Sequence, residues 1–567
     1  MIYTGDFETI RRGESMAVWL FDICNVETLE HVTVTDIGSG LDYLRDGDTI
    51  YFHNIKFDGH YIIDYLFRAG YKWVDESKLV NRKHGKKLMN FLITDMGVWF
   101  FGSIINDRGE KIRFIDSYKK IPLKVEVMAE SYKLPILKGK IDYTAPRPEG
   151  YQPTEKEIAY VRNDTEIVAR VLKIHFDEGM TELTAPSDAF KQLKKTVVDN
   201  YRKLGIKYMR EHPDVETFCR KAYCGGISWV APWVQEQEVG AGVVYDVNSL
   251  YPYVMRRYPY PVYYPKEIKD NTELDGYLWI AEFHVDVTKK LFTLPTLRDN
   301  ERNKWIETSY SGNVVMTSVD YEMLMENYTG EVTFIRGYRW IHSDDLLFED
   351  FVRYWGTRKQ ESSGGIRQIC KIMLNSSYGK FGLNPVKKRK RAYYHPFKRI
   401  VMYSDKDEDG NELVEEKGAN NVAIAAFITA YARRELSRGV AQSTGFCYCD
   451  TDSVHLSTYK DPITKRIVTP SFSGEVDPVL LGAWKKESTF SRAKYLRQKT
   501  YIEEQHYGPG GLEVKACGMP DECKRLVTWD NFRIGAKFPG KLMPKVRPGG
   551  IELVESDFTI HSPNIRF

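Results

Sequence analysis

The sequence predicts an α+β protein of several domains, and three observations indicate this class. The chain has 567 residues, and a single core rarely grows beyond about 250–300 residues, so about three or four domains are expected. Short apolar strands alternate with helical stretches in residues 1–184, whereas residues 258–347 are rich in strand signals and residues 348–382 are helical. Hydrophobic residues make up 42% and charged residues 28% of the chain, as in ordinary folded proteins.

The clearest element of the first region, 1–184, is a helix over residues 154–175. Thr154 and Glu157 give the capping-box pattern at its start. An apolar stripe follows at helical spacing and comprises Ile158, Val161, Val168 and Leu172.

The rest of the chain divides where composition and pattern change. The predicted segments are 185–257, with a helical part, the loop AYCGGISW and the strand VVYDV; 258–347, rich in Pro, Tyr and strands; 348–382, helical and basic; 383–419, a polar hairpin-like insert with a turn at DKDEDGNE; 420–523, with the helix AIAAFITAYARREL and a strand–turn–strand around DTDS; and 524–567, a small β-rich module.

Composition argues against a secreted or membrane protein. The first residues lack the pattern of a signal peptide, no apolar run reaches 18 residues, and the eight cysteines contain no CxxC pair. We therefore expect reduced cysteines, a cytosolic protein and no membrane partner. The net charge of +3 does not by itself indicate nucleic-acid binding, although metal-binding carboxylates can cancel phosphate-binding lysines in the sum.

Asp450 and Asp452 interrupt the apolar run GFCYCDTDSVHL. On a strand, two residues that lie two apart point to one face. Burying two like charges costs several kcal/mol unless a cation compensates, and hard oxygen ligands suit Mg²⁺. The alternative is a solvated Asp-Thr-Asp hairpin turn.

Asp246 is a further carboxylate within a strand-like apolar run, VVYDVNSLYP. Val244, Asp246 and Asn248 would share one strand face. Taken alone, an aspartate at a strand end is more often a cap or a turn residue than a metal ligand.

The segment GGIRQICKIMLNSSYGKFG predicts a basic helix face. Arg367, Lys371, Asn375 and Tyr378 fall on one side of a helix. Two cations one turn apart repel unless an anion lies over them, and a triphosphate is such an anion. The alternative is a solvated basic face. Combined with the aspartates, this face suits two-metal nucleotidyl transfer by positioning and electrostatics.

These motifs resemble those of family B DNA polymerases, in the protein-primed branch from tailed bacteriophages. The similarity lies in DVNSLYP, KIMLNSSYG and CDTDS, in Lys499-x-Tyr501, and in the Tyr-x-Gly-Gly linker formed by Tyr223, Gly225 and Gly226. It runs over nearly the whole chain.

The resemblance implies a right-hand polymerase behind an RNase H-like, DnaQ-like exonuclease domain. The implied domains are the exonuclease, 1–184; the palm, 185–257 and 420–523; a first insert for terminal-protein and DNA contact, 258–347; the fingers, 348–382; a second insert for processivity and strand displacement, 383–419; and the thumb, 524–567.

The resemblance also implies roles for individual residues of the polymerase half. Two Mg²⁺ ions, which Mn²⁺ can replace, would be held by Asp246, Val247, Asp450 and Asp452. Tyr251 would exclude a 2′-hydroxyl, and the other nucleotide-binding residues would be Arg367, Lys371, Asn375 and Tyr378. The contacts to primer and template would come from Tyr223, Gly225, Gly226, Lys499, Tyr501 and Lys515.

A second set of carboxylates lies in the first region. Asp6 and Glu8 share a strand face, Asp58 follows aromatic Phe57, and Tyr160 and Asp164 share a helix face. Alone, the first pair fits an exposed strand edge and the Asp58-Gly59 pair fits a turn. Four carboxylates from three elements suit two-metal hydrolysis, with a tyrosine orienting water.

These pieces resemble the three motifs of DnaQ-like proofreading exonucleases, which implies that this site also binds two Mg²⁺ ions. Lys138 matches an additional lysine of the protein-primed branch. The residues implied to grip single-stranded primer are His53, Asn54, Phe57, Ser117 and Tyr143. Tyr118 stands where the branch usually has leucine, and its role stays open.

The whole chain is thus expected to be a replicative DNA-directed DNA polymerase with 3′→5′ exodeoxyribonuclease activity. Its expected partners are template–primer DNA, dNTPs and, by resemblance, a terminal-protein primer, and we expect a monomer in the cytoplasm of a bacterial host. Lys387–Arg391 would contact phosphates or form a solvated basic stretch. Two alternatives are a nuclease whose second half only clamps DNA and an inactive nucleic-acid-binding scaffold.

Overall fold

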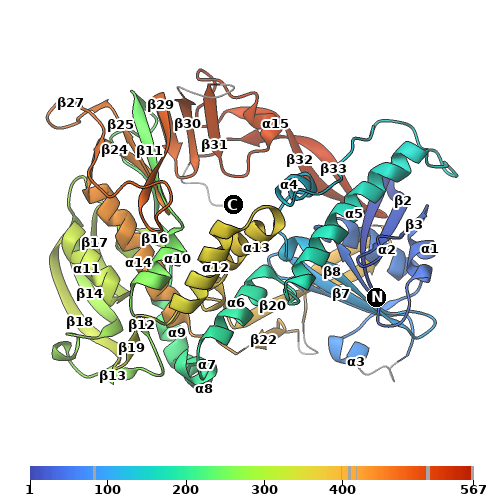
Figure 1. Ribbon diagram of the computed structural model, residues 1–567, viewed down its shortest axis with the longest axis horizontal. Helices are drawn as coiled ribbons and strands as arrows, with labels where there is room; N and C mark the ends of the chain where they lie inside the picture. Colours follow the sequence, from blue (N-terminus) through green and yellow to red (C-terminus); the bar gives the residue numbers. More distant parts are fainter. Residues whose placement is uncertain (81–84, 398, 407–409, 417, 506–510, 563–567) are drawn as a thin grey trace.

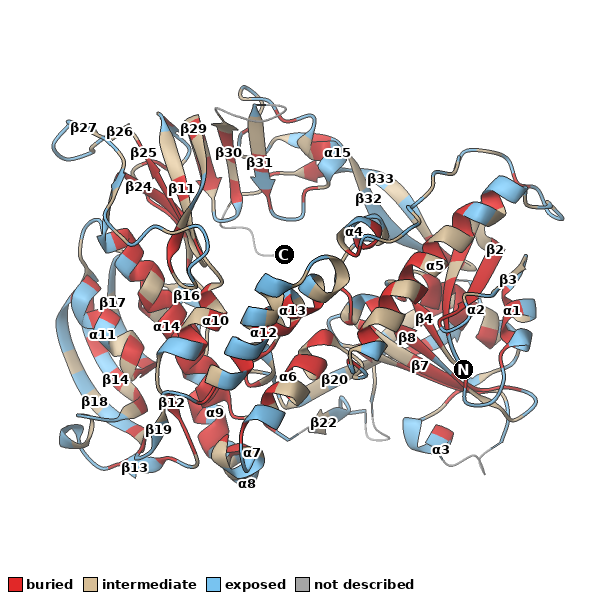
Figure 2. Ribbon diagram, in the orientation of Figure 1, coloured by how far each residue is buried: buried red, intermediate tan, exposed pale blue. Residues whose placement is uncertain are grey.

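The computed structural model describes residues 1–80, 85–397, 399–406, 410–416, 418–505 and 511–562 (Figure 1). The N-terminal strands lie at one end of its long axis, and the sheet of β14, β17 and β18 lies at the other. Helices α5 (Glu155–Asp177), α6 (Ala185–Thr196), α12 (Glu349–Glu361) and α13 (Gly364–Ser376) run between these ends (Figure 1). Buried residues concentrate where helices face sheets (Figure 2).

The N-terminal sheet has the strand order β21-β20-β6-β7-β8-β4-β1-β2-β3. Its strands are β1 (Ile2–Arg12), β2 (Ser15–Asn25), β3 (His31–Val34), β4 (Thr49–Phe52), β6 (Leu88–Thr94), β7 (Trp99–Ile105), β8 (Lys111–Asp116), β20 (Val386–His395) and β21 (Arg399–Ser404). Strand β1 pairs in parallel with β4 and antiparallel with β2, so the strand with Asp6 and Glu8 has neighbours on both sides.

Helix α5 (Glu155–Asp177) packs on β1 and β2. Thr154 and Glu157 form the predicted capping box, and Val161, Val168 and Leu172 are buried. The prediction of this helix is confirmed. Because α5 packs on the strand that carries Asp6, the polar residues of α5 that face this strand lie near Asp6.

The second main sheet has the order β31-β30-β29-β11-β25-β24-β9. Its strands are β9 (Ser228–Val230), β11 (Gly242–Val247), β24 (Phe446–Asp450), β25 (Ser453–Ser457), β29 (Trp484–Arg497), β30 (Thr500–Gln505) and β31 (Leu512–Ala516). The predicted helix around AIAAFITAYARREL is α14 (Val422–Ala441), which is buried along most of its length. It belongs to the same core cluster as β11, β24 and β25.

The segment predicted to be helical over 348–382 is two helices. They are α12 (Glu349–Glu361) and α13 (Gly364–Ser376), which pack on each other. The break is at Ser362 and Ser363, before Gly364, whose φ of +56° is a conformation that glycine adopts without a Cβ clash.

Residues 258–347 contain the predicted strands and, in addition, helix α11 (Ser318–Asn327). Strand β14 (Leu278–Lys289) lies between β17 (Ser309–Thr317) and β18 (Tyr328–Trp340). The buried guanidinium of Arg433 on α14 ties α11 to the central core by bonding Asp320 at 2.8 Å.

Strands β20 and β21 form a hairpin in the 383–419 segment, but the expected turn at 405–412 comes after β21 and does not join these two strands. Part of the expected turn, 407–409, lies outside the described residues. Strand β20 pairs with β6 through Arg389↔Thr94 and Lys390↔Ile93, so Lys387–Arg391 lie along an internal strand of the N-terminal sheet. Of the two expected positions, the tip and the base of a hairpin, they occupy the base, because the β20–β21 turn follows His395. Among them, Lys388 pairs with Glu412, and Arg389 pairs with Glu415.

The C-terminal segment forms the hairpin of β32 (Lys537–Arg547) and β33 (Gly550–Thr559), and its turn docks on the N-terminal region. The N–H of Met16 donates to Pro548 O at 2.8 Å, and Tyr61 Oη donates to Ile551 O at 2.6 Å. In Figure 1 this hairpin reaches from β30, β31 and α15 (Asp521–Lys524) toward α5 and β2.

All eight cysteines are free, in agreement with the prediction of reduced thiols. Among the described residues, no helix is both long enough and apolar enough to cross a membrane.

Candidate active sites

Asp246 and Asp452 come together at one end of the second sheet. Asp246 is near the end of β11, between β25 and β29. The N–H of Val247 donates to Asp452 O at 2.8 Å, so the backbones of the two motifs are joined directly. The predicted juxtaposition of the DVNSLYP and CDTDS motifs is therefore present.

Asp450 and Asp452 do not lie on one strand, as the period-two argument expected. Strand β24 ends at Asp450, β25 begins at Ser453, and Asp450 pairs with Ser453, which leaves Thr451 and Asp452 as a two-residue hairpin turn. Thr451 has a φ of +62°. The alternative prediction of an Asp-Thr-Asp hairpin turn is therefore correct as to the turn. The turn is half-buried, because Thr451 N–H donates to Ile227 O at 2.8 Å and Gly226 packs on Thr451.

Burial raises the pKa of both carboxyls at this end of the sheet. The pKa of Asp246 rises to about 7, first through burial and then through Asp452 and Glu487. The pKa of Asp452 rises to about 6 through burial, Asp450 and Glu487. Two half-buried carboxyls that disfavour each other's ionisation suit a divalent cation, which would remove the conflict.

Glu487 is a member of this cluster that the sequence reasoning missed. A register shift between Val244 and Tyr245 leaves Glu487 as an extra residue on β29, and such a bulge can re-aim a side chain. The signal available in the sequence was only a glutamate in WKKESTF, which resembles any exposed strand residue.

Lys499 and Tyr501 lie beside this cluster, as predicted. Lys499 Nζ contacts both Asp450 oxygens, at 2.8 and 2.9 Å, and Lys515 pairs in register with Tyr501. A cavity of about 510 Å³ is lined by Asp450, Asp452, Lys499, Tyr501 and Lys515, with Lys524 at its margin. A larger cavity, of about 700 Å³ between β14 and α14, contains none of the predicted site residues.

Tyr223, Gly225 and Gly226 form a loop against this end of the sheet. Arg433 donates to the carbonyl oxygens of Cys224 and Gly225, both at 2.9 Å. A Cβ on Gly226 would lie 2.8 Å from the Thr451 side chain. The loop and the aspartate turn thus need a glycine where they meet.

The predicted basic face is present on α13. Arg367, Lys371 and Asn375 are exposed, whereas Ile369, Cys370 and Met373 are buried. Tyr378 lies just beyond the helix, in the single 3-10 turn Tyr378–Lys380, and its ring stacks on that of Tyr251 from α10 (Leu250–Arg257).

Lys359 on α12 is a third cation of this face that the sequence reasoning missed. Its pKa is lowered by burial and by the charges of Arg367 and Lys371. Arg367 Nη1 also donates to Lys359 O at 2.7 Å. Three converging cations form a site for a polyanion, and the break between α12 and α13, which brings Lys359 back over Arg367, made this hard to foresee.

The four carboxylates of the N-terminal region also converge. Asp6 and Glu8 are on β1, Asp58 is the first residue of α2 (Asp58–Arg68), and Asp164 is on α5. Burial, then Asp164, raises the pKa of Asp6 to about 7. Burial, then Asp6 and Asp164, raises that of Glu8 to about 9. Burial and Asp6 also raise the pKa of Asp58 well above its ordinary value.

Lys138 reaches this cluster, as the resemblance implied. Its Nζ donates to Asp164 Oδ2 at 2.6 Å, and its charge lowers the pKa of Asp6, Glu8 and Asp164 against the effect of burial. Tyr160, one turn before Asp164, bonds the exposed Tyr143 through their hydroxyls at 2.8 Å.

Among the residues implied to grip a single strand, His53, Asn54 and Ser117 lie next to one another. His53 bonds Ser117 Oγ at 3.0 Å and Leu123 O at 2.8 Å. Asn54 is exposed, in a left-handed conformation, and its N–H donates to Asp116 at 3.0 Å. Tyr118 packs edge-on against His53, at 5.4 Å between centroids, and is 39% exposed.

The N-terminal cluster contains carboxylate oxygens that suit a divalent cation as ligands. Asp58 Oδ1 and Asp164 Oδ1 are buried without a hydrogen-bond partner, which is costly unless a cation contacts them. Within the described ranges, no three His, Cys, Asp or Glu side chains are already arranged to hold a metal ion. The carboxylates are therefore candidate ligands that would draw together on binding.

Comparison with known proteins places the chain in a family and gives its fold. The family described as DNA polymerase type B, organellar and viral, matches residues 42–149 and 145–466. The DNA polymerase of Bacillus phage phi29 is 36% identical, over 99% of each chain. Its structure in complex with primer–template DNA has a TM-score of 0.86 and 32% identity over 99% of both chains. Its ternary complex with primer–template DNA and incoming nucleotide substrates has a TM-score of 0.83, with the same identity and coverage. The predicted multidomain α+β fold is confirmed.

Proposed function

The chain belongs to the organellar and viral type B DNA polymerases, and from this premise we propose that it replicates DNA and also proofreads its own product. Synthesis is assigned to the Asp246/Asp452 cluster and 3′→5′ hydrolysis to the Asp6/Glu8/Asp58/Asp164 cluster. The observation that carries the proposal is that two sets of half-buried and buried carboxyls with raised pKa values lie at two separate sheets.

In the polymerase site, Asp246, Asp450 and Asp452, with Val247, would hold two Mg²⁺ ions, which Mn²⁺ can replace. When bound in such carboxylate sites, these ions activate an attacking oxygen and stabilise a leaving one. Lys359, Arg367 and Lys371 neutralise the triphosphate, with Asn375 beside them. The stacked rings of Tyr251 and Tyr378 form the surface against which the sugar and the base lie. No side chain forms a covalent intermediate in this scheme, because positioning and charge supply the catalysis.

In the exonuclease site, Asp6, Glu8, Asp58 and Asp164 would hold two ions of the same kind. Tyr160 orients the attacking water, and Lys138 favours the ionised carboxylates by its charge. His53, Asn54, Phe57, Ser117 and Tyr143 hold the single-stranded 3′ end. The exposed ring of Tyr118 offers a further stacking surface beside His53.

The proposed partners are template–primer DNA and dNTPs. The phi29 polymerase was solved with both, and that likeness supports the same for this chain. Lys499, Tyr501 and Lys515 would hold the primer terminus, and the loop of Tyr223, Gly225 and Gly226 would lie against the template–primer. We further propose a monomer in the cytoplasm of a bacterial host.

The domain division 1–184, 185–257, 258–347, 348–382, 383–419, 420–523 and 524–567 stays a proposal, as do the roles of the two inserts. Residues 258–347 would meet a terminal-protein primer, and residues 383–419 would support strand displacement. Because Lys388 and Arg389 are already paired with glutamates, any phosphate contact by Lys387–Arg391 must compete with these ion pairs.

The deciding experiment is incubation of a primed single-stranded circle with the protein and Mg²⁺, with and without dNTPs. We expect extension with dNTPs and degradation of the primer without them. Degradation without any extension would support a nuclease that clamps DNA, and neither reaction would support a scaffold. Terminal protein with dATP tests protein priming, which fails if no covalent adduct forms with any nucleotide.

A further inference from the structure

Asp22 is a buried carboxylate beside the proposed exonuclease site that belongs to none of its motifs. It is directly opposite Asp6 in the β1–β2 pair, so both side chains lie on one face of the sheet, and α5 packs on these two strands. Asp22 is 0% exposed, and its charge adds to the forces that raise the pKa of Asp6. A buried charge in such a place needs partners.

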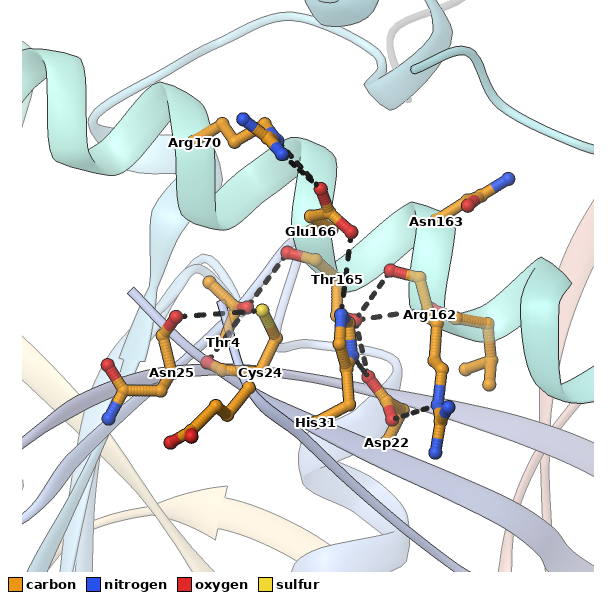
Figure 3. A network of polar contacts seen from close by, with 12 residues as sticks. Thr4, Asp22, Cys24, Asn25, His31, Arg162, Asn163, Thr165, Glu166 and Arg170 are labelled. Carbon is orange, nitrogen blue, oxygen red and sulfur yellow. Dashed lines mark hydrogen bonds and ion pairs between the residues drawn. The ribbon is translucent and has the colours of Figure 1, made fainter. Parts of the chain in front are cut away.

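The Asp22 carboxylate has hydrogen-bonding partners on helix α5 and on strand β3 (Figure 3). Thr165 Oγ1 on α5 donates to Asp22 Oδ2 at 2.5 Å. From β3, His31 Nδ1 bonds the same oxygen at 2.8 Å, and Thr33 Oγ1 donates to Asp22 Oδ1 at 2.7 Å. The carboxylate is therefore fixed between the sheet and the helix.

Thr165 is tied to the sheet a second time. Its carbonyl oxygen accepts from Thr4 Oγ1 on β1 at 2.8 Å. Thr4 lies two residues before Asp6, and Thr165 directly follows Asp164. We call these two hydrogen bonds of Thr165, to Asp22 and from Thr4, the bracket. The bracket joins α5, the helix that carries Asp164, to β1, the strand that carries Asp6, and to its neighbour β2.

An outer layer extends the bracket along α5. His31 Nε2 lies 3.5 Å from Glu166 Oε2, and Glu166 pairs with Arg170 at 2.6 Å. Arg162, one turn before Glu166, donates through Nε to Thr33 Oγ1 at 2.9 Å. Arg162 Nε also lies 3.8 Å from Asp22 Oδ1. Figure 3 shows this ion pair and the contacts of Glu166 with His31 and Arg170, which hold the helix against the sheet.

The bracket opposes a force that the site itself generates. The Asp164 charge raises the pKa of Asp6, which means that the two ionised carboxylates repel each other. Without a cation this repulsion pushes β1 and α5 apart. Ligands that are already held close lose less free energy when they converge on a metal ion.

We propose that Asp22 and Thr165 are positioning residues that keep Asp6 and Asp164 near enough to each other to converge on divalent cations. This inference rests on the proposed exonuclease function. Neither residue touches the reacting atoms in this scheme, so their effect should be on metal affinity and not on the chemistry itself.

The test measures Mn²⁺ binding to the full chain by the loss of the electron paramagnetic resonance signal of free Mn²⁺. Asp246→Ala and Asp452→Ala are included to weaken the polymerase site. Thr165→Val should weaken Mn²⁺ binding about 10-fold, and Asp22→Asn should act in the same direction. Thr165→Ser keeps the hydroxyl and should bind as the parent does.

The matched control is Thr429→Val on α14, because the Thr429 hydroxyl bonds only carbonyls of its own helix. It should leave Mn²⁺ binding unchanged. In the chain with an intact polymerase site, Thr165→Val should raise the Mg²⁺ concentration for half-maximal primer degradation and leave primer extension unchanged.

The outcomes separate this inference from the proposed function. Degradation by the parent chain, with Mn²⁺ affinity unchanged in both Thr165→Val and Asp22→Asn, overturns the positioning role and leaves the exonuclease standing. No degradation by the parent chain, with weakened Mn²⁺ binding in both variants, supports the positioning role and overturns the exonuclease. If Thr165→Val does not fold, the Mn²⁺ affinity of Asp22→Asn decides whether the positioning role stands. If Thr165→Ser binds Mn²⁺ as weakly as Asp22→Asn does, the result counts against the bracket.

Discussion

The rings of Tyr251 and Tyr378 lie stacked, with centroids 4.3 Å apart and planes 18° from parallel. Tyr251 comes from α10, directly after the strand with Asp246, and Tyr378 comes from the turn after the basic helix α13. The pair therefore joins the proposed metal site to the proposed triphosphate site, where the sugar of an incoming nucleotide would lie.

We expect Tyr251→Val to admit ribonucleotides. Removal of the ring opens space for a 2′-hydroxyl, so the preference for dNTPs over NTPs in primer extension should fall by about 10-fold or more. Tyr253→Val, two residues along the same helix, is the matched control and should keep the preference. Equal discrimination by Tyr251→Val and the parent chain would show that another residue excludes the ribose.

Asp452→Asn and Asp6→Asn should separate the two activities. The first removes a proposed ligand of the polymerase site and should slow primer extension by at least about 100-fold, while primer degradation without dNTPs continues. Asp6→Asn should do the reverse. The half-buried Asp461, directly after β26 (Tyr459–Lys460) and before β27 (Ile467–Val468), gives the control Asp461→Asn. Loss of both activities in either single variant would argue against two independent sites.

The sequence predicted best where the chain keeps a regular period or a cap. The helix of Thr154 and Glu157, the strand of Asp246 and the apolar side of α13 all follow from local pattern, and the structure has them. The clustering of Asp246 with Asp452 was implied by the resemblance, whereas Asp246 taken alone fitted a cap or a turn residue.

The errors arose where a local period gives way to a turn. Asp450 and Asp452 were assigned to one strand face, but Thr451 adopts a left-handed conformation in a two-residue turn. The helix over 348–382 was continued through Ser362 and Ser363, although the following Gly364 marks the break. Glu487 and Lys359 could not be found from the sequence, since a bulge and a helix reversal bring them to the site.

Lys138→Met should move the acidic side of the exonuclease pH–rate profile to higher pH. The Lys138 charge lowers the pKa values of Asp6 and Glu8, which burial raises to about 7 and about 9. Without that charge these pKa values rise further, and metal ligands must lose their protons to bind. At neutral pH the variant should therefore degrade primer more slowly and recover activity as the pH is raised.

Lys138→Arg keeps the positive charge beside Asp164 and serves as the control for this shift. Its profile should stay close to that of the parent chain. The measurement is the rate of removal of a 3′-labelled nucleotide from single-stranded DNA at saturating Mg²⁺. A Lys138→Met profile that is lower at every pH but not displaced would assign Lys138 to the chemical step and not to carboxylate ionisation.

Gly549→Ala should detach the β32–β33 turn from the N-terminal region. Gly549 has a φ of +88°, and a Cβ there would lie 2.2 Å from Met16 O, so the turn must move away. The hydrogen bonds from Met16 to Pro548 and from Tyr61 to Ile551 would be lost with it.

If the docked hairpin helps to enclose DNA, primer extension in the presence of a DNA trap should give shorter products per binding event. Gly540→Ala is the matched control, because Gly540 has a similar φ of +100° and its Cβ would lie near Glu522 and Cys523 and not near the N-terminal region. Equal product lengths from the two variants would mean that strain in the hairpin, and not its docking, sets the length.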